Sequence, residues 1–253
     1  MKILCIHSLA VHGTASLKTA ITVLGADVLP VASLYLTGLT NMEGHRRTNV
    51  AFDSLLEGSF ELCVSRKEKV ILYIGYLGEA SQLGLILRLI QRYRAWISDI
   101  VVDPVSGDQG RTYVSDSIIR AWPSLLAAAD WAFPNYTELR LFSGLPMEEN
   151  HEADVYQQRF ENRFPGLSYV ATSLPHPDKM HLRMKHKKTQ AMFLHELLDV
   201  HFGGTGDLFA TSFIKYHFLQ GHSAQWAMEE AAKFTLQQIR HSIELGRDEL
   251  VIH

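Results

Sequence analysis

Two runs that are apolar almost throughout constrain the fold of this chain more than any other feature. They are KVILYIG, residues 69–75, and DIVVDP, residues 99–104. A strand that is covered on only one face alternates apolar and polar residues, whereas a strand of a parallel sheet is covered on both faces and is apolar throughout. Between the two runs, residues 81–96 place apolar side chains three or four positions apart, which is typical of one face of a helix. We therefore expect a parallel sheet covered by helices.

The same alternation of strand and helix patterns continues along the chain. Further strands are expected at 2–6, 27–36, 131–135 and 167–173. Helices are expected at 16–25, 49–58, 115–129 and 137–144, and two longer ones begin within 204–221 and at Ser223. No internal repeat, linker or low-complexity segment divides residues 1–253. We expect a single α/β domain with a mostly parallel central sheet flanked by helices.

The composition argues against several classes of function. With 24 Lys and Arg residues against 27 Asp and Glu residues, the net charge is −3, so no basic face for nucleic acid is expected. The densest basic run, 179–188, is interpreted as a solvated strand or hairpin. The two cysteines form no CxxC pair, which fits a reducing compartment. The longest apolar stretch, 70–78, is far shorter than the ~18 residues of a membrane span. We expect a soluble cytoplasmic protein that binds neither nucleic acid nor membranes.

Polar and glycine-rich segments follow successive strands of the predicted sheet. Ligands of open parallel sheets bind at the carboxyl ends of the strands, in the loops that lead into helices. The segments are HSLAVHG (7–13), GYLGEAS (75–81), DPVSGDQG (103–110), FPNYTE (133–138) and GGTGD (203–207). Each alone has a structural explanation, because turns and helix starts use the same residue types. Together they are expected to surround one cleft, in which His12 is either a wall residue or an additional base.

The segment GGTGD, directly ahead of an apolar helix, points most clearly to chemistry. Amides at a helix start lack partners within the helix, the dipole there favours an anion, and glycines allow a phosphate group to approach closely. The chain has no Gly-Lys pair, which excludes a Walker A loop, and Phe209 stands where a dinucleotide fingerprint needs its third glycine. Asp207 either complements the dipole, worth about 0.3–1 kcal/mol, or accepts a proton from an attacking hydroxyl group.

The five segments together resemble a known set. GGTGDLFA is similar to the GTGD segment of pyridoxal kinases, members of the ribokinase superfamily. The pattern S-x-x-V-x-G at residues 8–13, GYLG (75–78), DPVSGD (103–108), PNYTE (134–138) and the tail GRDELVIH resemble further family segments in the same order. The resemblance implies a ribokinase-like three-layer α/β/α fold assembled as a homodimer. It also implies ATP-dependent phosphorylation of the 5′-hydroxymethyl group of pyridoxal, pyridoxine or pyridoxamine.

The resemblance also implies roles for individual residues. Asp207 would be the base, and the amides of Gly204, Thr205 and Gly206 would form the anion hole. The vitamin site would be made of Ser8, which hydrogen-bonds the pyridine ring, with Val11, Thr40 and Tyr76. Asp103, Asp108 and Glu138 would act on Mg²⁺ and the phosphates, directly or through water, with Asn135 beside them. Thr172 and Ser173 would lie near the nucleotide phosphates, which residues 174–198 would cover. Whether potassium is also required stays open.

One loop departs from the family pattern and keeps alternatives open. Pyridoxal kinases carry a run resembling SNHTxY after the second strand, whereas this chain has TGLTNM at 37–42, where only Thr40 matches. The preferred B6 vitamer is therefore open. A hydroxymethylpyrimidine kinase is the nearest alternative, although many of those have cysteine where Asp207 stands. A sugar kinase, a metal-dependent phosphatase built on Asp103 and Asp108, and a sensor of a B6 vitamer or nucleotide without turnover are further alternatives.

Overall fold

The protein has alternating strands and helices in a computed structural model that describes residues 1–176, 179–198 and 200–253. The strands are β1 (Lys2–Ala10), β2 (Val28–Leu36), β3 (Arg47–Thr48), β4 (Val70–Ile74), β5 (Ile97–Val102), β6 (Gly107–Asp108), β7 (Arg111–Thr112), β8 (Trp131–Ala132), β9 (Ser168–His176), β10 (Lys179–His186) and β11 (Thr189–Glu196). The helices are α1 (Leu17–Leu24), α2 (Phe52–Ser65), α3 (Ala80–Tyr93), α4 (Asp116–Leu126), α5 (Tyr136–Ser143), α6 (Ala153–Arg163), α7 (Thr205–Ile214) and α8 (Ala224–Glu244). A π-helical turn, Lys215–Leu219, continues α7.

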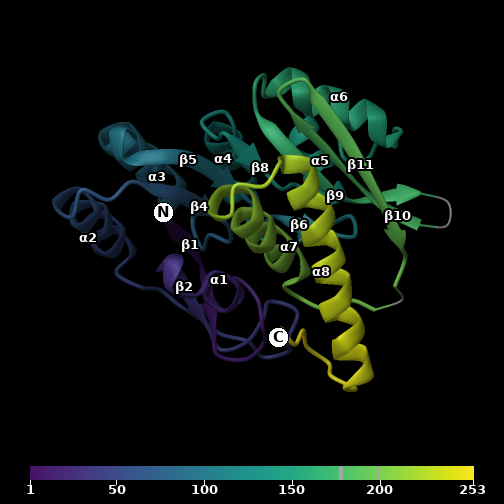
Figure 1. The fold of residues 1–253 in the computed structure, drawn as a ribbon, viewed down its shortest axis with the longest axis horizontal. Coiled ribbons are helices and arrows are strands. Elements are labelled where there is room, and N and C mark those ends of the chain that lie inside the picture. Colours follow the sequence, from purple (N-terminus) through teal and green to yellow (C-terminus); the bar gives the residue numbers. More distant parts are fainter. Residues whose placement is uncertain (177–178, 199) are drawn as a thin grey trace.

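A nine-stranded sheet in the order β11-β10-β9-β8-β5-β4-β1-β2-β3 forms the centre of the fold (Figure 1). The strands from β9 to β2 in this order are parallel, and β3, β10 and β11 are antiparallel to their neighbours. In the register of the central strands, Ile6 of β1 lies opposite Val31 of β2 and Ile74 of β4. The predicted fold, a mostly parallel sheet flanked by helices, is confirmed.

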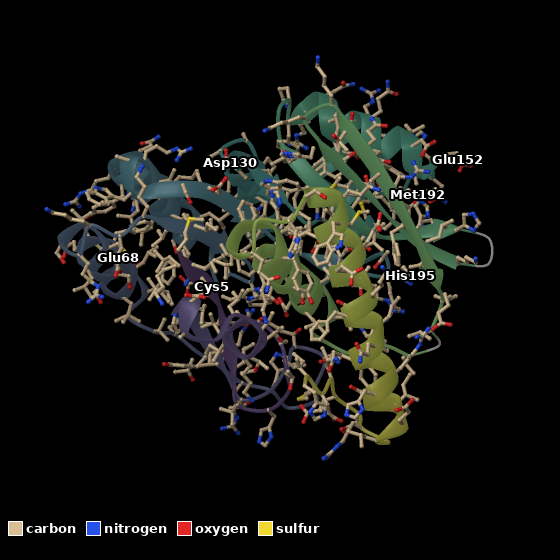
Figure 2. The ribbon with its side chains drawn as sticks, in the orientation of Figure 1. Cys5, Glu68, Asp130, Glu152, Met192 and His195 are labelled. Carbon is tan, nitrogen blue, oxygen red and sulfur yellow. The ribbon has the colours of Figure 1, made fainter. Side chains whose placement is uncertain are left out.

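Both faces of the sheet are covered, which explains the continuous apolar runs in its central strands. Leu4 and Ile6 of β1 face the core that contains residues of α2 to α6, whereas Ile3 and Cys5 face the core beneath α1, α7 and α8. Figure 1 shows α7 and α8 over the same face of the sheet, and Cys5 lies in the interior (Figure 2). Within the described part of the chain, no helix is both long and apolar enough to span a membrane.

Several predicted elements differ from the structure in extent. The helix expected to end at Gly58 continues to Ser65, because Phe60 and Cys63 are anchored in the core and Gly58 lies at an open surface. The strand expected at 131–135 covers only residues 131 and 132. The basic run 179–188 does form a hairpin, β10–β11, as interpreted from the sequence.

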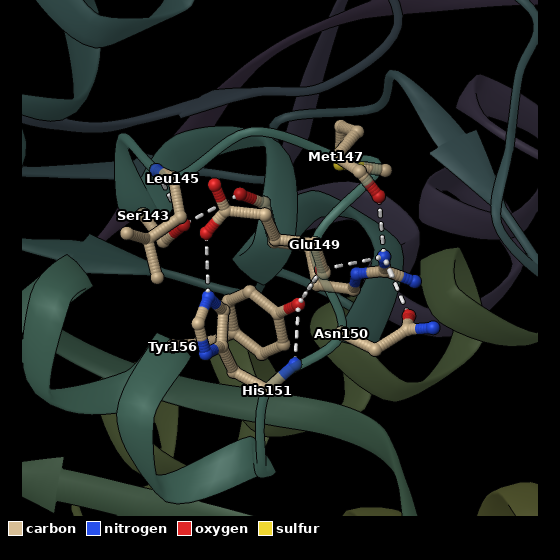
Figure 3. Close-up of polar contacts among 8 residues, drawn as sticks. Ser143, Leu145, Met147, Glu149, Asn150, His151 and Tyr156 are labelled. Atoms are coloured by element: carbon tan, nitrogen blue, oxygen red, sulfur yellow. Dashed lines mark hydrogen bonds and ion pairs between the residues drawn. The ribbon is translucent and has the colours of Figure 1, made fainter.

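Helix α6 has no counterpart among the predicted elements. It follows a loop that polar contacts hold in place (Figure 3). The Tyr156 hydroxyl donates to the Glu149 carbonyl (2.5 Å) and accepts from the His151 amide (3.1 Å), and Arg140 donates to the Met147 carbonyl (2.7 Å). Only Tyr156 and Phe160 of α6 are buried, so the sequence carries no broad apolar stripe that would indicate a helix.

Candidate active site

A cavity of about 490 Å³ lies at the carboxyl ends of the parallel strands. It is lined by residues from all five polar segments and from the loop after β2, among them Ser8, Thr40, Tyr76, Asp103, Asp108, Asn135, Glu138, Gly204, Thr205, Gly206 and Asp207. A second cavity of about 250 Å³ is lined by Thr172 and Ser173 together with Met180, Leu182 and His195 of the β10–β11 hairpin. His195 is labelled on the hairpin in Figure 2. Both cavities are lined by Thr205 and Gly206, so the start of α7 lies between them.

Two of the residues singled out in the first loop lie elsewhere. Val11 is 66% exposed, and His12 is also exposed; neither is among the described residues that line the two cavities. The expected covering segment 174–198 does contribute side chains to the second cavity. Residues 177 and 178 of that segment lie outside the described residues.

Asp207 is held from two sides in the first turn of α7. It is 9% exposed, and its Oδ2 accepts a hydrogen bond from the Ser16 amide at 2.7 Å. Its Oδ1 lies 2.9 Å from Nε2 of His7. Ser16 adopts a left-handed φ of 56°, and its hydroxyl accepts a hydrogen bond from the Ser8 hydroxyl at 3.0 Å. The loop after β1 therefore orients the carboxylate that the sequence singled out.

His7 is a site residue that sequence reasoning missed. It is 1% exposed, and its Nδ1 accepts the Tyr76 amide hydrogen at 3.0 Å. Gly75 makes room for the ring, because a Cβ at that position would lie 1.9 Å from Nε2 of His7. The available signal was a polar residue inside an otherwise apolar strand, one position before Ser8.

The glycines before α7 leave backbone amides available at the helix start. Gly204 has φ +91°, and a Cβ there would lie 2.3 Å from the Thr14 carbonyl oxygen, so the chain requires glycine. The first helical hydrogen bond runs from the Leu208 amide to the Gly204 carbonyl (2.9 Å), and the amides of residues 205–207 precede it. A cavity that contains these amides is suited to an anion.

The acidic residues divide into a buried pair and a more accessible member. Burial raises the pKa of Asp103 well above its usual range, and the neighbouring charges of Glu138 and Asp207 raise it further. Burial likewise raises the pKa of Glu138 to about 8. Hydrogen bonds from the backbone of Asn135, Ser106 and Gly107 oppose this shift, because they stabilise the charged carboxylate. Asp108 is partly exposed and lines both cavities.

The predicted metal ligands Asp103, Asp108 and Glu138 are not the residues whose potential ligand atoms lie closest together. Both carboxylate oxygens of Glu138 accept backbone hydrogen bonds, Oε1 from the Ser106 amide (2.8 Å) and Oε2 from the Asn135 amide (3.0 Å). Glu138 therefore fixes the loop after β5 to the start of α5. In the described part of the chain, the three potential ligand atoms that lie within 4.8 Å of one another belong to His7, Asp103 and Asp207 instead.

The divergent loop after β2 is built into the site. Leu39 packs against two glycines: a Cβ on Gly13 would lie 2.4 Å from Leu39 Cγ, and one on Gly203 would lie 2.8 Å from Leu39 Cδ1. Arg47, which follows this loop, donates a hydrogen bond to the Tyr76 hydroxyl. Leu39 thus joins the first loop to the glycine-rich segment across one wall of the cavity.

Comparisons with known proteins agree with this architecture. A pyridoxal kinase from Dictyostelium discoideum is 26% identical over 161 residues, which span 60% of this chain and 53% of that protein. A pyridoxine/pyridoxal/pyridoxamine kinase from Bordetella avium is 29% identical over 175 residues, 66% of this chain and 58% of that protein. The chain thus matches between half and three fifths of the length of these relatives. The resemblance to pyridoxal kinases inferred from the sequence is confirmed.

The fold comparison covers more of the chain. A phosphomethylpyrimidine kinase homologue from Bacteroides thetaiotaomicron has a TM-score of 0.86 and is 26% identical, with 98% of this chain and 88% of that one covered. A family model described as phosphomethylpyrimidine kinase matches residues 14–253. Because this match includes nearly the whole chain, the protein belongs to the phosphomethylpyrimidine kinase family.

Proposed function

We propose that this protein is a kinase that transfers the γ-phosphoryl group of ATP to the 5′-hydroxymethyl group of a B6 vitamer. The observation that carries the proposal is Asp207, a buried carboxylate at the start of α7, where the amides of residues 205–207 precede the first helical hydrogen bond and two cavities meet. A form of the Bacteroides protein was solved with pyridoxal, at 27% identity and a TM-score of 0.84. A pyridoxal kinase from Leishmania donovani with the same fold was solved with ADP and pyridoxamine.

The two cavities provide one place for each substrate. The larger is assigned to the vitamer, with Tyr76 and Leu39 as apolar walls and Ser8 and Thr40 as polar groups near the ring. The smaller, with Thr172 and Ser173, is assigned to the nucleotide. The start of α7 would then lie beside the point where the hydroxyl group meets the γ-phosphate.

The proposed transfer uses few protein groups. The substrate oxygen forms a bond to the γ-phosphorus while the bond from that phosphorus to the ADP oxygen breaks, and the hydroxyl proton goes to Asp207. The amides of Gly204, Thr205 and Gly206 donate to the oxygens of the transferring group, where negative charge gathers. Since phosphoryl transfer depends mainly on positioning and electrostatics, this set suffices.

The residues fit a magnesium ion in the larger cavity, because the carboxylates of Asp103 and Asp108 are the oxygen ligands that Mg²⁺ prefers. Glu138 would act through water, since backbone amides already occupy both of its oxygens. The ion would neutralise negative charge on the phosphates. A potassium requirement, the homodimer and the single-domain organisation stay predictions.

The first experiment is a substrate panel with a matched control. Purified protein is given Mg-ATP with pyridoxal, pyridoxine, pyridoxamine or hydroxymethylpyrimidine, and Asp207→Asn and Asp53→Asn are assayed alongside. Asp53 is an exposed aspartate in the first turn of α2 and is not among the described residues that line the two cavities, so its variant removes only a charge that complements a helix dipole. We expect Asp207→Asn to lose about 10²–10⁴-fold in turnover and Asp53→Asn to be unchanged. Near-normal turnover by Asp207→Asn would show that it is not the base.

A hydroxymethylpyrimidine kinase is the second candidate, because the family model and the Bacteroides homologue carry that description. Turnover of the pyrimidine alone would support this candidate and keep the mechanism. Asp207 favours the B6 activity, since many pyrimidine kinases resembling this family have cysteine there. Binding of ATP without turnover of any alcohol would instead indicate a sensor.

A further inference from the structure

His7 carries its proton on the nitrogen that faces Asp207. Its Nδ1 accepts the Tyr76 amide hydrogen at 3.0 Å, and a ring nitrogen that accepts a hydrogen bond bears no proton. The proton of the neutral ring is therefore on Nε2, which lies 2.9 Å from Asp207 Oδ1. The backbone of the loop after β4 thus sets the tautomer of a side chain on β1.

This tautomer excludes metal binding, which is the other role suggested by the cluster of His7, Asp103 and Asp207. The ligand atoms of His7, Asp103 and Asp207 lie within 4.8 Å of one another, as in a metal site. A metal on Nε2 would displace its proton to Nδ1, and metal-bound histidines donate that proton to an acceptor. Here the Tyr76 amide is a donor, so two N–H groups would face each other. The cluster is suited to a hydrogen bond and not to a metal ion.

We propose that His7 is a positioning residue whose Nε2–H, with the Ser16 amide, holds the Asp207 carboxylate toward the substrate hydroxyl. The inference rests on the proposed function of Asp207. The two donors lie against different oxygens: the Ser16 amide donates to Oδ2, and His7 Nε2 lies 2.9 Å from Oδ1. The His7 pair has the right distance but lacks hydrogen-bond alignment. Catalytic hydrogen bonds often align only when substrate is bound.

The burial of His7 gives its Nε2 few polar partners. The side chain is 1% exposed, and within the described part of the chain Asp207 is the acceptor at contact distance. A buried N–H without a partner is costly, so the ring and the carboxylate favour mutual alignment. Held in this way, the Asp207 carboxylate does not turn toward the amides at the start of α7. The transferring phosphoryl group needs those amides as hydrogen-bond donors.

Two substitutions of His7 separate the roles of its two ring nitrogens. The glutamine amide reaches as far as Nε2, so His7→Gln keeps a donor to Asp207. Asparagine reaches only as far as Nδ1, so His7→Asn keeps only the acceptor for Tyr76. We expect His7→Gln to stay within about threefold of the parent in kcat and His7→Asn to lose about 10- to 100-fold, with KM for both substrates little changed. Equal losses in the two variants, or a loss confined to KM, would overturn the proposal.

A double-mutant cycle and a spectrum complete the test. If His7 acts through Asp207, then His7→Asn adds no further loss in an Asp207→Asn background, whereas additive losses would contradict the inference. The tautomer can be measured independently of activity. The ¹⁵N chemical shifts of the His7 ring, which are assigned because they disappear in His7→Gln, should show a proton on Nε2. A proton on Nδ1 would also overturn the proposal. If Asp207→Asn itself keeps turnover, the base assignment fails, and the ring spectrum still reports on the contact.

Discussion

Replacing Gly75 with alanine tests the architecture that places His7. The new Cβ would lie 1.9 Å from His7 Nε2, 2.2 Å from Cδ2 and 2.6 Å from Cε1. Ordinary contact is about 3.5 Å, so the ring must move by about 1.5 Å. That movement breaks the hydrogen bond with the Tyr76 amide and the contact with Asp207. Overpacking costs about 1–3 kcal/mol, and the buried amide left without a partner costs about 1–3 kcal/mol more.

Denaturant unfolding and initial-rate kinetics measure the two consequences separately. We expect the free energy of unfolding to fall by about 2–6 kcal/mol, and turnover of the folded fraction to fall about 100-fold, as for a 1 Å displacement near reacting groups. Gly78→Ala is the control in the same segment, because its Cβ meets only the flexible Leu34 side chain at 3.3 Å. Combining Gly75→Ala with His7→Ala should recover part of the stability by removing the clash. If Gly75→Ala were as stable as Gly78→Ala, the position inferred for the ring would be wrong.

Three further predictions concern other parts of the site and the core. Gly204→Ala should lower the free energy of unfolding by about 1–3 kcal/mol, because its Cβ would meet the Thr14 carbonyl at 2.3 Å. Gly206→Ala should instead be at least as stable as the parent and bind ATP more weakly in calorimetry. Asp108→Asn should change stability by no more than about 0.5 kcal/mol and raise the Mg²⁺ concentration that gives half-maximal turnover. Burial lowers the pKa of His181, whose ring nitrogens lack partners, so the folded protein disfavours its charged form. The free energy of unfolding should therefore fall as the pH drops below about 6.5, and His181→Leu should weaken this dependence and add about 1–2 kcal/mol.

The sheet could be predicted from the sequence because strands that are buried on both faces contain continuous apolar runs, which are visible in the sequence. The segment that forms β4 is apolar and buried throughout, and so are the last three residues of β5, 100–102. The extent of some elements could not be predicted, because tertiary contacts decide it. Gly58 would end an isolated helix, yet α2 continues past it since Phe60 is held in the core. Helix α6 escaped prediction because its polar residues contact the hairpin: Lys185 pairs with Glu161.

The candidate site could be predicted in part for a similar reason. Strand-end loops reveal their residues by position, so Asp103 is found from the predicted sheet. Asp207 is found from the glycine-rich segment at the start of its helix. His7 lies within a strand, where a single polar residue is usually structural. The role of Glu138 could not be read from the sequence, because the amides that occupy its oxygens come from two different loops.

The glycines of the segment GGTGD have three separate causes. Gly203 leaves space for Leu39, whose Cδ1 would lie 2.8 Å from a Cβ there, and Gly204 combines a left-handed φ with close approach to the Thr14 carbonyl. Among the residues that the structure describes, nothing lies within 4 Å of a Cβ on Gly206, although this glycine lines both cavities. Glycine in a helix costs about 1 kcal/mol relative to alanine, so its presence at 206 supports the proposed approach of a phosphate group to the backbone. The divergent Leu39 loop fits the first of these positions, which indicates that loop and glycine segment are adapted to each other.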